Sequence, residues 1–189
     1  ATRLVAMTVA QFASETAAES AAPGGGSVSA AVGAFGAALG TMVANLSSHK
    51  RGWDHRWQEF SDHAEQGQRA VQELLFLVDE DTRAFDRVMA GFGMPRGTDA
   101  EKAARRLAID TATLEATRIP FRVMETVLGV MPLIKLMAEQ GQPSSVSDAG
   151  VGALCARAAV MGAYLNVQIN AASLKGNAEA AELVAKGAG

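Results

Sequence analysis

The chain has 189 residues, 49% of them hydrophobic and 20% charged, which is enough apolar material for one domain with a substantial core. Its formal net charge of -3 argues against nucleic acid as a partner. The single cysteine, Cys155, excludes an internal disulfide framework and favours a reducing compartment. The first residues also lack the basic and apolar regions of a signal peptide, so we expect a cytoplasmic protein.

The chain begins with a predicted short helix followed by a turn of glycines. Thr8 is placed to cap this helix, which runs to about Ala18 with Phe12 on its inner face. The segment Pro23-Gly24-Gly25-Gly26-Ser27 comes next, and its three glycines let the backbone approach another group closely. A glycine turn that opens a helix is suited to an anion. This one lacks the Gly-Lys-Ser/Thr ending of a nucleotide-binding loop.

A long helix with little side-chain bulk is predicted from Ser27 to Leu46. Ala and Gly recur there at helical spacing, with Gly36 and Gly40 four residues apart, so a neighbouring helix is expected to pack unusually close. The segment is long enough to cross a bilayer, but its polar residues and the lack of a second span favour a buried helix in a soluble bundle without a membrane partner. Lys50 at the far end complements the helix dipole.

The third predicted helix extends from near Asp54 to near Gly91. Its apolar residues alternate in steps of three and four over about five heptads, which predicts a long helix packed lengthwise on others. Asp81 falls on this seam, where burial would raise its pKa and suit acid/base chemistry; a core ion pair is the structural alternative. Asp79 and Glu80 fall off the seam and are expected to be solvated. The seam comprises Trp57, Phe60, Ala64, Gly67, Val71, Leu74, Val78, Asp81, Phe85, Val88 and Phe92.

Three further helices complete the predicted order. Thr98 and Glu101 have the spacing of a capping box for the fourth helix, which Pro120 and Pro132 are expected to bend or break. A turn over residues 141–144 precedes a fifth helix from about Ser147 to about Ser173, and a short terminal helix follows Asn177. The fourth helix is expected to face inward through Leu107, Leu114, Phe121 and Leu128, and the fifth runs through Val151, Leu154, Ala158, Met161 and Leu165.

Asp148, in the first turn of the fifth helix, is the second candidate carboxylate. Its spacing from Ser145 fits a capping box, so helix capping explains it as well as catalysis does. The three histidines and the lone cysteine lack the spacing of a zinc site, and no Gly-x-Ser-x-Gly motif is present. These observations predict an all-α bundle of long, partly kinked helices over residues 1–189, without a metal. They do not name a substrate.

Five groups of residues stand along the chain in a fixed order: Ala22-Pro23-Gly24-Gly25-Gly26-Ser27, Met42-Val43-Ala44-Asn45-Leu46 with Lys50, Asp79-Glu80-Asp81, Val146-Ser147-Asp148-Ala149-Gly150-Val151, and Leu165-Asn166-Val167 with Asn170. Together they resemble the cyclodeaminase/cyclohydrolase family of folate enzymes, and the likeness covers about Phe12 to Ala172. The chain departs from the family at His49, where glycine is usual, and at Gln142-Pro143-Ser144, where Asn-x-Asn is frequent.

The resemblance implies one cyclodeaminase/cyclohydrolase-like domain over residues 1–189, forming a homodimer. It further implies a tetrahydrofolate derivative as substrate in a cleft near the subunit interface, without a cofactor. Either methenyltetrahydrofolate would be hydrolysed to 10-formyltetrahydrofolate, or formiminotetrahydrofolate would be cyclised with release of ammonia. A non-catalytic helical dimer that kept the fold is the alternative. The implied catalytic residues are Asp81, Asp148 and Lys50, and the implied substrate contacts are Gly24, Gly25, Gly26, Ser27, Asn45, Ser147, Asn166 and Asn170.

Overall fold

The computed structural model describes residues 3–189, which form helices and no strands, as the sequence predicts. Short 3-10 helices at Leu4–Ala6, Asp54–Arg56 and Pro143–Ser145 precede α1, α3 and α5. The six α-helices are α1 (Val9–Thr16), α2 (Gly25–Ser48), α3 (Trp57–Phe92), α4 (Asp99–Gln140), α5 (Val146–Ala172) and α6 (Ala178–Gly187).

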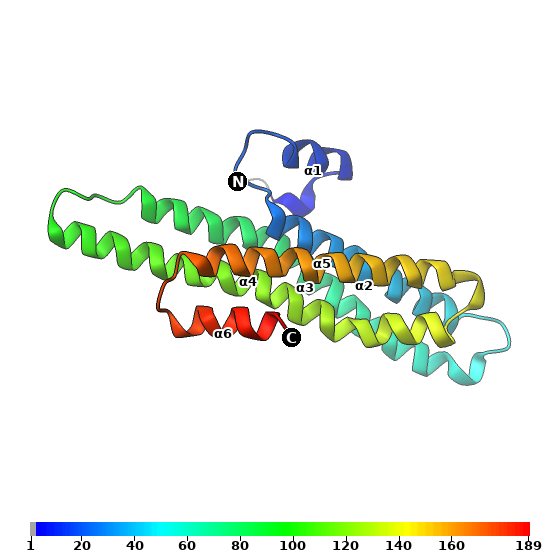
Figure 1. The fold of residues 1–189 in the computed structure, drawn as a ribbon. Helices are drawn as coiled ribbons and strands as arrows, with labels where there is room; N and C mark the ends of the chain where they lie inside the picture. The colour runs from blue at the N-terminus through cyan, green and yellow to red at the C-terminus, as the bar shows by residue number, and fades with distance from the viewer. Residues whose placement is uncertain (1–2) are drawn as a thin grey trace.

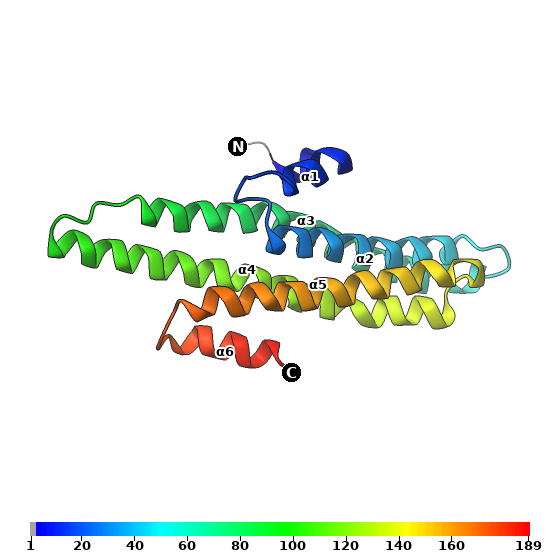
Figure 2. The ribbon, with the colours of Figure 1, turned by 45° about the horizontal axis from the view of Figure 1, so that its top comes forward.

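Four long helices form the bundle (Figures 1 and 2). α2 packs against α3 and α5, and α4 packs against the same two helices. With 36 and 42 residues, α3 and α4 are about 54 and 63 Å long, whereas α2 and α5, with 24 and 27 residues, reach only about 36 and 40 Å. The α3–α4 hairpin therefore extends beyond the start of α2 and the end of α5, which leaves a ledge at that end of the bundle (Figure 1).

α2 packs unusually close to its neighbours, as its glycines predict. A Cβ added to Gly36 would lie 2.9 Å from the carbonyl oxygen of Gly152 on α5, and one added to Gly40 would lie 2.9 Å from Cγ1 of Ile134 on α4. Both distances are shorter than van der Waals contact allows, so any larger side chain would push the helices apart. The close approach predicted for these two glycines is confirmed, and both contacts lie within one chain.

α4 differs from its prediction in two ways. It runs without a break through Pro120 and Pro132. Pro120 has no N–H to donate to the carbonyl of Ala116, and that carbonyl instead accepts a 2.9 Å hydrogen bond from Nδ2 of Asn170 on α5. The predicted inner face was wrong at Leu107 and Leu128, which are 69% and 51% exposed, whereas Phe121 packs against the core. The buried face is Ala112, Thr113, Thr117, Pro120, Val123, Met124, Val127, Val130, Leu133, Ile134 and Met137.

α5 buries its small residues and exposes its large ones. The buried side consists of Ala149, Gly152, Ala156, Ala159, Ala163 and Val167, which let α5 lie close to α2. Four residues of the predicted run are at least half exposed, namely Val151, Leu154, Met161 and Leu165. α5 is also long and apolar enough to cross a membrane by length and composition, as is α2, so the expectation that no second candidate span exists was wrong.

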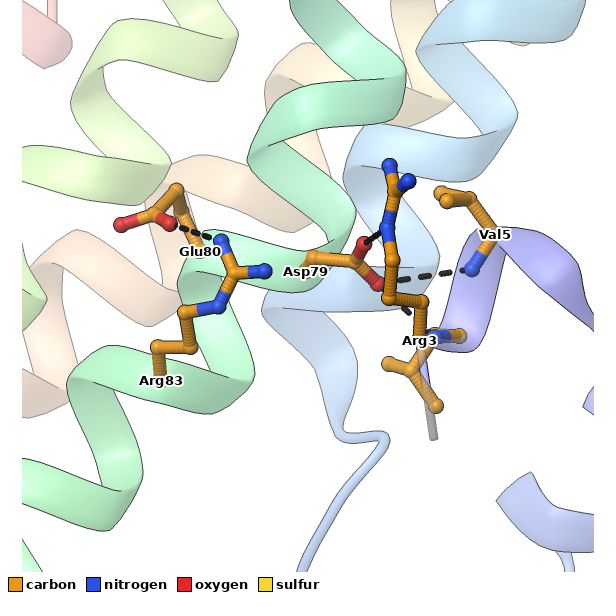
Figure 3. Close-up of polar contacts among 6 residues, drawn as sticks. Arg3, Val5, Asp79, Glu80 and Arg83 are labelled. Carbon is orange, nitrogen blue, oxygen red and sulfur yellow. Dashed lines mark hydrogen bonds and ion pairs between the residues drawn. The ribbon is translucent and has the colours of Figure 1, made fainter. Parts of the chain in front are cut away.

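The N-terminal segment is fastened to α3 by Asp79, which is 6% exposed rather than solvated as expected (Figure 3). Its carboxylate accepts hydrogen bonds from the backbone N–H of Leu4 at 2.8 Å and of Val5 at 3.4 Å, and from Nε of Arg3 at 3.0 Å. These contacts satisfy a charge that would otherwise be costly to bury. Glu80 is also only partly exposed, and it forms an ion pair with Arg83, one turn further along α3.

Candidate active site

The first turn of α2 meets α3 at Asp81. A Cβ on Gly26 would overlap the Asp81 carboxylate, so only glycine lets the two helices approach at this point. The hydroxyl of Ser27, itself fully buried, donates a 2.8 Å hydrogen bond to Oδ2 of Asp81. Asp81 lies on the inward side of α3 and is only half-buried, so its predicted orientation is confirmed.

The charge of Asp81 is not balanced by a neighbouring cation. Within residues 3–189, no lysine, arginine or histidine forms an ion pair with it. Burial raises the pKa of the Asp81 carboxyl above its ordinary value, and hydrogen bonding from Ser27 opposes part of that rise. A carboxylate in this setting takes up a proton more readily than a solvated one, which suits a general base.

Asp81 faces a cavity of about 380 Å³ beside the ledge left by α3 and α4. The glycines at the start of α2 form one wall, α3 and α4 form the floor, and the last turns of α5 close the other side. The wall is apolar through Phe85, Phe92 and Ile109, and polar through Thr82, Asp110 and Thr113. A mixed lining of this kind suits an aromatic ligand with polar edges.

Sequence reasoning missed Asp110 and Thr82 as cavity residues. Asp110 is three residues before the buried Thr113, so the two share a face of α4. The inner face of α4 was predicted from the spacing of its leucines, so Asp110 was not expected to face the bundle. Thr82 directly follows Asp81 and lies 3.4 Å from the hydroxyl of Ser27.

Asn166 and Asn170, the two predicted asparagines, line the same cavity, and each also donates a hydrogen bond to a backbone carbonyl. Nδ2 of Asn166 donates to the carbonyl of Gly162 at 2.9 Å, and Asn166 also lies against Gly25. Asn170 supports α4 at the carbonyl of Ala116, as described above. Each side-chain amide retains one further hydrogen and its oxygen for a ligand.

The other predicted site residues lie at the opposite end of the bundle. α2 is about 32 Å long from Ser27 to Ser48, and Lys50 follows its end. Lys50 and Asn45 line a separate, open cavity of about 540 Å³. The Lys50 ammonium lies 3.7 Å from the ring centroid of Trp53, and no carboxylate among residues 3–189 pairs with it.

Asp148 and Ser147 also lie away from the Asp81 cavity. Asp148 is in the first turn of α5, about 27 Å along that helix from Asn166. It is half-buried, and Ser147 is exposed. The capping box predicted with Ser145 does not form, because the Ser145 side chain makes no capping hydrogen bond. Within one chain, Asp81 and Asp148 therefore do not form a single acid/base pair.

Residues 3–189 contain no group of three or more histidine, cysteine, aspartate or glutamate side chains that could hold a metal ion. The Asp81 cavity offers the carboxyl groups of Asp81 and Asp110, hydroxyl groups and side-chain amides.

Comparison with known proteins identifies the family. The sequence model described as Formiminotransferase-cyclodeaminase matches residues 8–188, almost the whole chain. The chain belongs to this family. The fold of this chain is similar to that of a solved structure, formiminotetrahydrofolate cyclodeaminase from Thermotoga maritima, with a TM-score of 0.82. The two sequences are 24% identical, and the match covers 96% of this chain and 88% of that one.

Curated proteins similar to this chain include one named as a cyclohydrolase and one named as a cyclodeaminase. The methenyltetrahydrofolate cyclohydrolase of Methylorubrum extorquens is 37% identical over 142 residues, covering 75% of this chain and 68% of that protein. The formimidoyltransferase-cyclodeaminase of Rattus norvegicus is 36% identical over 130 residues, covering 69% of this chain. The matched region spans only 24% of the rat protein's length.

Proposed function

We propose that this chain is a folate one-carbon enzyme that acts at the N5/N10 bridge of a tetrahydrofolate derivative. Its membership of the family and the names of its relatives support an enzyme of this class. One structural observation supports a location for the active site. Asp81, which has a raised pKa and accepts a hydrogen bond from Ser27, faces a cavity with aromatic and polar walls.

The chemistry follows from the charge of the bridge. A methenyl group between N5 and N10 is an amidinium cation, which a nearby carboxylate stabilises. The same carboxylate can accept a proton from the water that attacks the bridge carbon, and then return it to the nitrogen that leaves. In the cyclising direction, the protonated carboxyl group would assist the departure of ammonia.

One carboxyl group therefore serves both reactions, because each passes through a tetrahedral carbon bonded to N5 and N10. The remaining substituent is a hydroxyl group in hydrolysis and the departing amino group in cyclisation. Hydrolysis of methenyltetrahydrofolate and cyclisation of formiminotetrahydrofolate are both proposed. The relatives include proteins named for each reaction.

We propose further that residues 1–189 act as one domain of a homodimer in the cytoplasm, with no cofactor besides the folate substrate. The exposed apolar side of α5 supports self-association, since soluble monomers rarely leave such a face uncovered. Gly24, Gly25 and Gly26 would shape the folate cavity, and Asn166 and Asn170 would contact the polar edge of the pterin.

The test is a spectroscopic assay with both substrates, which follows loss or gain of the methenyl chromophore. Asp81→Asn is expected to lower turnover about 100-fold or more while substrate affinity, measured by calorimetry, changes little. Asp86→Asn is the matched control, because Asp86 is an exposed carboxylate of the same helix that lines neither the Asp81 cavity nor the Lys50 cavity, and its turnover is expected to stay at the parental level. An Asp81→Asn protein with parental turnover would refute the assignment. A parent protein inactive on both substrates would favour the non-catalytic alternative.

A further inference from the structure

α4 keeps a proline in its buried interior, where proline is the least favourable residue for a helix. Pro120 is buried, whereas Pro132, the other proline of α4, is exposed. A proline has no N–H to donate, and its ring crowds the carbonyl group four residues earlier. Neighbouring buried positions of α4 carry Thr117, Val123 and Met124, which fill a core without that cost. The choice of proline at position 120 therefore calls for a reason beyond packing.

The carbonyl group that Pro120 leaves free belongs to the floor of the Asp81 cavity. Ala116, whose oxygen would accept the missing helical hydrogen bond, lines that cavity, and Pro120 does not. The oxygen instead accepts a 2.9 Å hydrogen bond from Nδ2 of Asn170, which lines the same cavity from the last turns of α5. A residue outside the cavity thus creates the anchor for a side chain inside it.

This anchor settles which way the Asn170 amide is turned. A carbonyl oxygen only accepts hydrogen bonds, so the NH2 group of Asn170 has to face Ala116. Without the anchor, the amide could rotate by half a turn and exchange its donor with its acceptor. Asn166 differs in this respect, because its anchor is the carbonyl of Gly162, one turn earlier on its own helix, and does not depend on α4.

We propose that Pro120 is a positioning residue for substrate binding, which acts by leaving the carbonyl of Ala116 free to orient the Asn170 amide. Oδ1 and the second N–H of Asn170 are then presented to the ligand in a fixed order. An acceptor beside a donor is the complement of the N3–H and O4 of a pterin. An amide that is already oriented also loses less side-chain entropy when the ligand binds. The inference rests on the proposed function, because the ligand is the folate substrate.

Replacement of Pro120 by alanine reverses this arrangement without disturbing the cavity lining. The new N–H donates to the carbonyl of Ala116 and draws that oxygen back along the helix axis. Asn170 then has to share its anchor, and its amide regains the freedom to rotate. α4 itself gains a hydrogen bond, so the variant is expected to remain folded.

The experiment compares the parent, Pro120→Ala, Asn170→Ala and the double variant. Activity of the parent on both folate substrates is measured first, and calorimetry then gives the affinity of each protein for tetrahydrofolate, which has no bridge to react. Pro120→Ala is expected to weaken this affinity and to raise KM about 3- to 10-fold, the worth of one hydrogen bond. Its kcat should stay near the parental value, because Asp81 is not disturbed. The double variant should match Asn170→Ala alone, since Pro120 then has no amide to orient.

Urea unfolding gives a second readout that does not involve the ligand. Asn170→Ala leaves the carbonyl of Ala116 without its partner and should lower the urea midpoint. The double variant supplies the N–H of residue 120 and should recover that loss. Pro132→Ala is the matched control: it removes the other proline of α4, at an exposed position that lines neither cavity, and should leave the affinity and KM at the parental level.

Three results would overturn the positioning role of Pro120. These are parental affinity in Pro120→Ala, losses of affinity that multiply in the double variant, and a urea midpoint that the double variant does not recover. Multiplying losses would mean that Pro120 and Asn170 act independently. Each of these results in an active parent leaves the proposed function standing. A parent that is inactive on both substrates and does not bind tetrahydrofolate would refute the proposed function, and this inference with it.

Discussion

Replacement of Gly26 by alanine should displace the Asp81 carboxylate while leaving its chemistry unchanged. The added Cβ would overlap the carboxylate, which has to retreat by roughly 1 Å or more to restore van der Waals contact. A misplacement of that size costs a catalytic group about 100-fold in rate, equivalent to about 2.7 kcal/mol of transition-state stabilisation. The same overlap should lower the free energy of unfolding by about 1 to 3 kcal/mol, offset in part by the better helix propensity of alanine.

The neighbouring glycine provides the control. A Cβ on Gly24 would lie 3.9 Å from the carbonyl oxygen of Ala21, an ordinary contact, and the backbone φ of Gly24 is -107°, which alanine adopts freely. Gly24→Ala should therefore keep the free energy of unfolding and the position of the Asp81 carboxylate. Steady-state kinetics with the active folate substrate and urea unfolding are measured for both variants. If Gly26→Ala matches the parent in kcat/KM, the position of the Asp81 carboxylate does not limit the reaction.

Three further predictions concern pH and packing. Ser27→Ala removes a hydrogen bond that lowers the pKa of Asp81, so the pKa of Asp81 should rise further. The ionised base is then lost at a higher pH as the pH falls, so the acidic limb of the kcat/KM profile should move to higher pH, and an unmoved limb would contradict this. Asp79→Ala leaves buried backbone N–H groups without an acceptor and should lower the free energy of unfolding by about 1 to 3 kcal/mol in urea titrations, whereas a solvated carboxylate would cost almost nothing. Gly36→Ala should destabilise by about 1 to 3 kcal/mol, whereas Gly129→Ala, in an open part of α4, should stabilise by up to about 1 kcal/mol; equal shifts in thermal unfolding would refute backbone packing at Gly36.

Helix boundaries were predictable because local chemistry sets them. Thr8 caps α1 as predicted, and Thr98 forms the capping box that its spacing from Glu101 indicates. The glycines of α2 lie close to neighbouring helices, as their lack of side chains allows. The effect of Pro120 could not be predicted in this way. Its missing hydrogen bond is replaced by Asn170, a residue 50 positions later in the chain, and such tertiary compensation leaves no local signal.

The choice of helix face failed where large apolar residues point outward. In α4 the leucine spacing indicated an inner face through Leu107 and Leu128, both of which are exposed. Hydrophobic periodicity locates an apolar stripe, and it does not say whether the stripe faces its own core or a second molecule. The same ambiguity affected α5, where alanines and glycine form the buried side and Leu154 faces outward.

The candidate site was predictable around Asp81, because its position on the α3 seam is a local pattern. The predicted second helix already separated Lys50 from Ser27. The sequence could not show that Asp81 packs on the Ser27 end or that Asp148 lies at the other end, since the packing of α3 and α5 on α2 is long-range. Asp79 illustrates the opposite error: it is off the seam but buried, because the N-terminal segment covers that side of α3.

The glycine-lined packing of α2 makes this helix an unusual target for protein engineering. In a deep mutational scan, substitutions at Gly26, Gly33, Gly36 and Gly40 should be depleted whatever residue is introduced, since even alanine collides with a neighbour at each of these positions. Outward positions of the same helix, such as Asn45, carry no such steric limit. A library designed to improve expression or to change substrate preference should therefore fix these four glycines and diversify the outer positions, which keeps most of its members folded.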